Sequence, residues 1–229
     1  MALDFQIKLD ECKNDENIRC ILITGSGKAF CAGQDLSEAI DENGPGLKKI
    51  VEKHYNPIIR KIRNIEKPII AAVNGVAAGA GASIALCCDI VVAKKSAVFV
   101  QAFSKIGLIP DSAATFFLPR LIGLQKASGL MMTADPISAD DAYKIGMIYK
   151  VYEDNDFDSE VLKLAEILSK MPIKGLGLTK KLLNLSLTNN LDSQLNEELN
   201  AQIIAGNTND YNEGVSAFLE KRKPNFKGN

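Results

Sequence analysis

The sequence predicts an α/β fold with mostly parallel strands, followed by a region built only of helices. Short β-branched runs alternate with helical patterns over residues 18–152, as in β-α-β connections. From residue 158 onward the pattern is helical to the end. The 229 residues, 46% of them hydrophobic, suffice for one sizeable core. We therefore expect a core over residues 1–157 and a helical region over residues 158–229.

The expected strands are apolar runs bounded by turn-forming residues. They cover residues 18–24, 69–73, 90–93, 98–100 and 148–152. The first strand ends at Gly25-Ser26-Gly27 and the second at Asn74-Gly75, so both lead into turns. We expect a loop over residues 29–35 and another over residues 106–110.

Helical patterns fill the remaining segments of the core. They start near residue 3 and continue over residues 36–43, 47–65, 79–88, 112–121, 125–132 and 138–146. Pro57 predicts a kink in the helix over residues 47–65, because proline lacks an amide hydrogen and its ring clashes with the preceding turn. Ser138-Ala139-Asp140-Asp141 resembles a capping box.

Charge and cysteine content narrow the possible partners. The net charge is −1, so no excess of positive charge favours nucleic acid or an anionic membrane surface. The five cysteines are odd in number, show no paired spacing and follow no signal peptide, which predicts reduced thiols and a cytoplasmic protein. The single histidine, His54, cannot form a metal cluster alone, and we expect no metal site.

The long apolar stretch over residues 69–93 does not predict a membrane span. A spanning helix needs roughly 20 mostly apolar residues. Here Asn74-Gly75 and further glycines interrupt the stretch, and Asp89 would cost roughly 3 kcal/mol inside a membrane. A buried strand, turn and helix explain the same residues without that cost.

Two glycine motifs fall short of nucleotide-binding fingerprints. Gly25-Ser26-Gly27-Lys28 lacks the first glycine of a P-loop and the hydroxyl residue after the lysine. Gly79-Ala80-Gly81 lies between a strand and a helix, as in dinucleotide-binding proteins, but Ile84 stands where the third glycine belongs. An NAD-type binder remains an alternative class.

Gly79 to Gly81 also suggests a site for anionic oxygen. The first amides of a helix have no internal partner, and they lie at the positive end of the helix dipole. A thioester oxygen that becomes an enolate needs such donors. The loop Ala32-Gly33-Gln34-Asp35 is a candidate for a second amide. Close packing of helix on strand explains the glycines equally well.

Asp111 has two interpretations. It precedes the helix expected from residue 112, so it is well suited to cap that helix. Its apolar neighbours Ile109, Phe116 and Phe117 would raise the pKa of its carboxyl toward values useful in acid/base catalysis. Spacing alone favours the cap.

Together, these motifs resemble the crotonase (enoyl-CoA hydratase/isomerase) family over nearly the whole chain. The order of several motifs at matching separations makes the resemblance specific. They are the segments 28–36, 68–81, 88–90, 107–111, 118–123, 137–142 and 213–224.

The resemblance implies a spiral of ββα units that assembles as trimers or pairs of trimers through the helical region. It implies a coenzyme A thioester as substrate, with no further cofactor. The family's oxyanion hole corresponds here to the backbone amides of Gln34 and Ala80. The residues expected near coenzyme A are Lys28, Ala32, Asp35 and Leu36.

The resemblance also favours isomerisation over hydration. Family hydratases use two glutamates, whose positions are occupied here by Ser83 and Phe103. The Pro110-Asp111 pair resembles family members that shift a double bond or rearrange a ring epoxide, which assigns the acid/base role to Asp111. The candidates for the wall of the acyl pocket are Phe103, Phe116, Met131 and Met132, and core packing explains each of them at least as well.

Two other functions remain open: hydration of a 2-enoyl-CoA through another group, and binding of acyl-CoA without turnover. Family members usually carry about two strands before the segment that Ala2-Leu3 continues. We therefore expect an exposed sheet edge.

Overall fold

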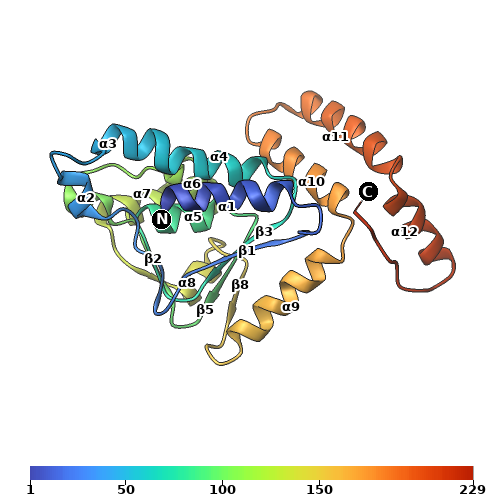
Figure 1. Ribbon diagram of the computed structural model, residues 1–229, viewed down its shortest axis with the longest axis horizontal. Coiled ribbons are helices and arrows are strands. Elements are labelled where there is room, and N and C mark those ends of the chain that lie inside the picture. Colours follow the sequence, from blue (N-terminus) through green and yellow to red (C-terminus); the bar gives the residue numbers. More distant parts are fainter. Residues whose placement is uncertain (229) are drawn as a thin grey trace.

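The computed structural model describes residues 1–228 and confirms the α/β class (Figure 1). Its strands form two four-stranded sheets, with the orders β1-β3-β5-β8 and β2-β4-β6-β7. The first sheet contains β1 (Ile21–Thr24), β3 (Ile69–Val73), β5 (Ile90–Lys94) and β8 (Lys150–Tyr152). The second contains β2 (Ala29–Cys31), β4 (Val76–Ala78), β6 (Val98–Val100) and β7 (Ile137–Ser138).

From β1 to β6, consecutive strands alternate between the two sheets, which produces a spiral. The pairs β1/β2, β3/β4 and β5/β6 each contribute one strand to each sheet before the chain turns into a helical segment. All strand pairs are parallel except β6 with β7. β1 pairs only with β3 and is therefore an edge strand, as expected.

Three strands were missed from the sequence. β2 lies in the segment predicted to be a loop, and β4 and β7 were not predicted. Each has two or three residues, which is too short to show the alternation that identifies a strand. The segment Ala102–Ile106, partly predicted as loop, is a 3-10 helix.

The helices of the core are close to the predicted ones. They are α1 (Ala2–Asn14), α2 (Leu36–Ile40), α3 (Gly46–Lys49), α4 (Asn56–Asn64), α5 (Ala80–Leu86), α6 (Ala114–Ile122), α7 (Leu124–Thr133) and α8 (Ala139–Lys144). Ser138 caps α8, since its hydroxyl accepts a hydrogen bond from the Asp141 amide at 3.1 Å.

The helix predicted over residues 47–65 is divided just before Pro57, which is the second residue of α4. The preceding turn, Ile50–Tyr55, forms a π-helix between α3 and α4. Proline lacks the amide hydrogen that would bond the carbonyl four residues earlier, at Lys53. The Gln6 side-chain amide of α1 donates to the carbonyls of Lys53 at 2.8 Å and His54 at 3.0 Å, so these groups remain paired.

The first sheet separates two apolar layers. Along β3, Ile69, Ala71 and Val73 belong to the main core, which α1, α4 and α5 help to form. Ile70 and Ala72 point the other way, into a smaller cluster that includes Phe157 at the start of α9 (Phe157–Ser169). In Figure 1, α1 and α4 run side by side on one face, and α9 lies on the opposite face.

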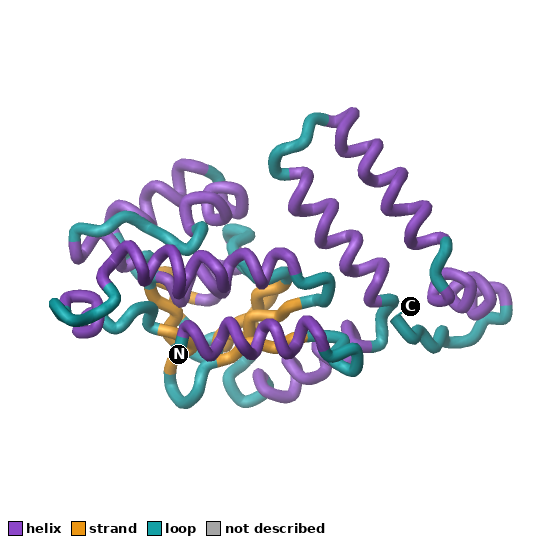
Figure 2. The backbone as a smooth tube through the Cα atoms, turned by 45° about the horizontal axis from the view of Figure 1, so that its top comes forward, coloured by secondary structure: helices purple, strands orange, loops and turns teal. Residues whose placement is uncertain are grey.

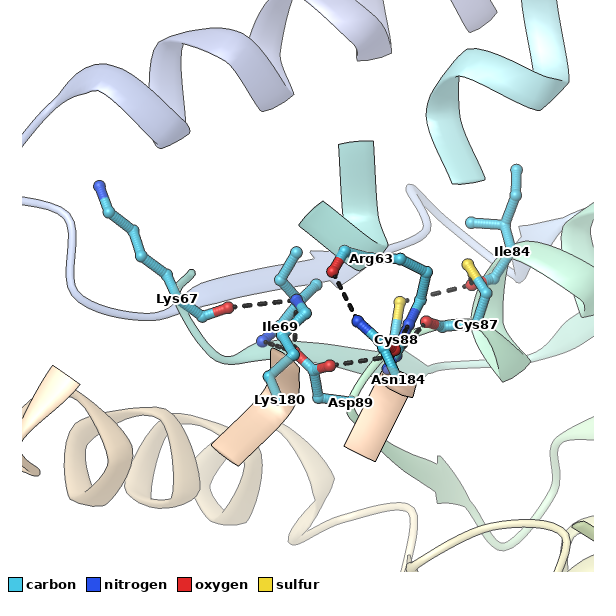
Figure 3. A network of polar contacts seen from close by, with 9 residues as sticks. All are labelled: Arg63, Lys67, Ile69, Ile84, Cys87, Cys88, Asp89, Lys180 and Asn184. Atoms are coloured by element: carbon cyan, nitrogen blue, oxygen red, sulfur yellow. Dashed lines mark hydrogen bonds and ion pairs between the residues drawn. The ribbon is translucent and has the colours of Figure 1, made fainter. Parts of the chain in front are cut away.

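A partly buried ionic cluster joins one helix of the C-terminal region to the core (Figure 3). Asp89, which follows α5, accepts hydrogen bonds from the Ile69 amide at 2.9 Å and Arg63 Nη1 at 3.1 Å. Lys180 of α10 (Ile173–Ser186) places Nζ 2.8 Å from Asp89 Oδ2, although only 6% of this lysine is exposed. The Arg63 guanidinium also donates to Asn184 of α10. The Asp89 charge is thus compensated by two cations.

The remaining helices project from the core (Figures 1 and 2). α11 (Leu191–Gly206) packs against α10, and α12 (Asn209–Leu219) follows it. Exposed apolar side chains recur along one face of α11, at Leu191, Leu195, Leu199 and Ile203. All five cysteines are free. Among residues 1–228, no helix has the length and apolar character needed to span a membrane.

Candidate active site

Asp111 lies on a constrained turn between the 3-10 helix and α6. The next two residues, Ser112 and Ala113, have positive φ angles of 53° and 63°, which non-glycine residues rarely adopt. Such backbone strain is concentrated at functional sites. The helix-cap interpretation of Asp111 is wrong. α6 begins only at Ala114, and the residue before it, Ala113, makes no side-chain cap.

The Asp111 carboxyl is half-buried and has one hydrogen-bond donor among residues 1–228, the Ser112 hydroxyl at 2.9 Å. Burial raises the pKa of Asp111 because it penalises the charged form. The Ser112 hydrogen bond lowers the same pKa by a smaller amount. The net result is a carboxylate that is more basic than an ordinary aspartate.

The two predicted oxyanion-hole segments lie side by side. A Cβ atom built on Gly33 would stand 3.3 Å from the Ala80 nitrogen and 3.2 Å from the Ala78 oxygen, so the loop before Gln34 touches the start of α5. Within the described chain, the Gln34 and Ala80 amides donate to no other residue. Two neighbouring backbone donors are therefore free to bind a ligand oxygen.

Gly79 and Gly81 are required for different structural reasons. Gly79 has a φ of 52°, which positions the chain for the first amide of α5. A Cβ on Gly81 would stand 2.2 Å from the Cys31 oxygen, so this glycine allows α5 to pack against the β2 segment. Both the packing and the donor interpretations of the motif are thus compatible with the geometry.

Ser83 and Phe103 flank the same backbone. The Ser83 hydroxyl donates to the Gly79 carbonyl at 3.2 Å, and its side chain is buried in α5. The Phe103 ring lies beside Gly79, with Cζ 3.8 Å from the position of a Gly79 Cβ. Neither side chain is a carboxylate, so neither can act as the base of a hydratase.

The other predicted pocket residues are distributed unevenly. Phe103 is buried. The Phe116 and Phe117 rings make an edge-to-face contact with their centroids 5.1 Å apart, and the Arg120 guanidinium lies over the Phe116 ring. Met131 packs against the main core, whereas Met132 is 77% exposed and is not part of that core. The residues expected near coenzyme A, which are Lys28, Ala32, Asp35 and Leu36, are exposed around β2 and the start of α2.

Two buried side chains with polar atoms were not singled out in the sequence. Tyr55 ends the π-helical turn, where an aromatic residue among apolar ones looks like ordinary core. Gln101 follows β6, and both atoms of its amide are enclosed without a partner among residues 1–228. The sequence does not single out either position, because what distinguishes them is a polar atom without a hydrogen-bond partner, which only the structure shows.

Comparison with known proteins identifies the class that this fold and site define. The chain belongs to the enoyl-CoA hydratase/isomerase family, which it matches over residues 1–229. The predicted resemblance to crotonases is therefore confirmed.

Some relatives in this family are named isomerases and others hydratases. The chain is 49% identical to a 1,2-epoxyphenylacetyl-CoA isomerase of Escherichia coli (strain K12), covering 96% of this chain and 85% of the relative. It is 37% identical to a crotonyl-CoA hydratase of Syntrophomonas wolfei, covering 98% and 86% of the two chains. A crystal structure of an enoyl-CoA hydratase from Polaromonas sp. JS666 has a TM-score of 0.91 at 35% identity, and the match covers 99% of this chain and 89% of that one.

Proposed function

We propose that this protein is an acyl-CoA isomerase that uses Asp111 as its single acid/base. The substrate would be an enoyl- or phenylacetyl-type coenzyme A thioester, in which the enzyme shifts a double bond or rearranges a ring epoxide. The observation that carries the proposal is the half-buried Asp111, whose pKa is raised, in a site where Ser83 and Phe103 stand at the positions of the hydratase glutamates.

The proposed reaction needs one base and one place for negative charge. Asp111 removes a proton from a carbon of the acyl chain, and the electron pair moves toward the thioester carbonyl. The Gln34 and Ala80 amides hold the enolate oxygen, at roughly 3 kcal/mol per donor. The protonated Asp111 then returns the proton to a different carbon, which restores the carboxylate and releases the isomer.

Binding and assembly complete the proposal. The exposed loop with Lys28, Ala32, Asp35 and Leu36 would bind coenzyme A, and no further cofactor takes part. The apolar face of α11 would be covered by neighbouring subunits in a homotrimer or a dimer of trimers, since an exposed apolar stripe of this kind commonly marks an interface. We propose a cytoplasmic location.

The test is an assay of both reactions on one protein. A 3-enoyl-CoA is supplied, and the conjugated 2-enoyl thioester is followed by absorbance, while hydration of 2-enoyl-CoA is measured in parallel. We expect isomerisation that is lost in Asp111→Asn and retained in Asp135→Asn, a matched change at an exposed aspartate.

Hydration without isomerisation would contradict the proposal and favour the hydratase function that the Syntrophomonas wolfei relative is named for. Another group would then have to activate water. Binding of coenzyme A thioesters with neither reaction would instead identify a non-catalytic acyl-CoA binder.

A further inference from the structure

Arg63, near the end of α4, donates hydrogen bonds from every nitrogen of its side chain (Figure 3). Nη1 donates to the Cys87 carbonyl at 2.8 Å and to the Asp89 carboxylate at 3.1 Å. Nε donates to the side-chain oxygen of Asn184 at 2.9 Å, and Nη2 donates to the same oxygen. The Asn184 side-chain amide in turn donates to the Arg63 carbonyl at 3.0 Å. The guanidinium plane is therefore fixed along its whole edge.

The contact with Cys87 joins Arg63 to α5, the helix that begins with the Ala80 amide. Cys87 ends the last turn of α5, since its own amide donates to the Ser83 carbonyl at 3.1 Å. Carbonyls at this end of a helix lack partners within it, and the helix dipole favours a cation there. α5 has 7 residues, which corresponds to a length of about 10 Å. Arg63 thus holds one end of a short helix whose other end provides a predicted oxyanion donor.

The face of the same guanidinium packs on α6, the helix that follows Asp111. Arg63 Cζ lies 5.4 Å from the centroid of the Phe117 ring, within the range of a cation–π contact. The Phe117 amide donates to the Ala113 carbonyl at 3.0 Å, and the Ala114 amide donates to the Asp111 carbonyl at 3.0 Å. Phe117 therefore lies one turn from the strained segment that carries the proposed base. α5 and α6 also pack against each other.

We propose that Arg63 is a positioning residue, which sets the spacing between the Ala80 amide and the Asp111 carboxylate. Asn184 orients Arg63 from α10, so the packing of the C-terminal region also acts on the site. This inference rests on the proposed function, because it concerns the geometry of that reaction. A displacement of about 1 Å between reacting groups can lower a rate by about 10². Lysine can pair with Asp89 but lacks the planar fork and the stacking face of arginine.

The test measures rates per binding site in Arg63→Lys, Phe117→Leu and Asn184→Ala. Calorimetric titration with phenylacetyl-CoA counts the sites, and isomerisation of a 3-enoyl-CoA gives kcat. We expect kcat per site to fall about tenfold in the first two variants and by less in Asn184→Ala, while the Kd for phenylacetyl-CoA changes by less than about twofold. A merely structural role would lower Tm and the number of sites without changing the rate at each site.

Two further variants sharpen the test. Asn189→Ala is the matched control, because the Asn189 side-chain amide is also half-buried but donates to Gln194 of α11 at 3.1 Å. This variant should keep the wild-type rate per site. The double variant Arg63→Lys/Phe117→Leu should lose little more than either single variant, since both substitutions break the same contact. Fully additive losses would overturn the route through Phe117.

Deuterium exchange at the α-carbon of phenylacetyl-CoA separates this inference from the proposed function. Rates per site within about twofold of the wild type in all three variants overturn the role of Arg63 alone. A wild-type protein that exchanges deuterium without isomerising overturns the proposed reaction, and the exchange rates of the variants then decide the role of Arg63. Asn184→Ala leaves Arg63 in place, so it remains decisive if the other two variants do not fold. A wild-type protein inactive in both assays overturns both proposals.

Discussion

Two partly buried aspartates, Asp89 and Asp111, have opposite surroundings. Asp89 receives hydrogen bonds from a backbone amide and Arg63, and forms an ion pair with Lys180 (Figure 3). Asp111 has one neutral donor, Ser112, and burial raises the pKa of its carboxyl. A compensated charge fastens helices together, whereas a poorly compensated one is available to take up a proton. The comparison separates a structural residue from a candidate catalytic one.

The largest effect is expected from Asp111→Asn, which should lower kcat/KM for isomerisation by about 10²–10⁴. The amide fills the same space but cannot accept the substrate proton. Steady-state kinetics measure the loss, with Asp135→Asn as control. A change within a few-fold would remove Asp111 from the mechanism.

The same variant should be more stable than the wild type at neutral pH. The pKa of Asp111 is raised in the folded state, so the folded protein binds the proton more readily than the unfolded chain. Stability therefore falls as pH rises from the unfolded-state pKa of Asp111 to its folded-state pKa. Above that interval the destabilisation from burying the charged carboxylate is complete. Asparagine carries no charge and removes this cost. A Tm of Asp111→Asn below that of the wild type at pH 7 would contradict the assignment.

Asp89→Asn should do the reverse and destabilise the fold by about 3 kcal/mol, because Lys180 and Arg63 are left without their counter-ion. The free energy of unfolding is measured by denaturant titration at pH 7. Asp135→Asn should change it by less than about 0.5 kcal/mol, as is usual for exposed positions. Equal effects of the two substitutions would show that the ionic cluster does not hold α10 in place.

Gly81→Ala should destabilise the protein and impair catalysis together, since its Cβ would overlap the Cys31 oxygen and displace α5. A cost of about 1–3 kcal/mol is expected for such overpacking. Gly129→Ala in α7 is the matched control, because a Cβ there meets no atom within 4 Å. That change should be neutral or should stabilise the helix by up to about 1 kcal/mol. Comparable losses in both variants would argue against the close contact.

The smallest effect is expected from Ser112→Ala. The serine hydroxyl lowers the pKa of Asp111, so its removal should raise that pKa further. Because the base must be ionised, the acidic limb of the kcat/KM profile should move toward higher pH, with less than a tenfold loss of activity at pH 7. A limb that moves toward lower pH, or stays fixed, would mean that another group controls it.

The sequence predicted what depends on local pattern. The runs that form β3 and β5, the capping serine at Ser138 and the glycine-rich start of α5 follow from apolar periodicity and turn chemistry. β2 and β4 were missed because their short segments, Ala29–Cys31 and Val76–Ala78, are rich in alanine and adjoin glycine-containing loops, so that only pairing with neighbouring strands identifies them.

The two aspartates show the same limit. The helix-cap interpretation of Asp111 failed because Ser112 and Ala113 adopt positive φ angles, which no local rule predicts for these residues. The Asp89–Lys180 ion pair joins distant segments, so only the fold brings its members together. The free hydroxyl of Tyr55 likewise becomes visible only when its surroundings are known.

The most direct test of the central claim is deuterium exchange at the α-carbon of phenylacetyl-CoA in D₂O, followed by mass spectrometry. This exchange requires a base and an oxyanion site but no particular acyl rearrangement. Wild-type protein should incorporate deuterium, and Asp111→Asn should do so at least about 10² times more slowly when both are saturated with ligand. Equal exchange rates in the two proteins would contradict the assignment of Asp111 as the base.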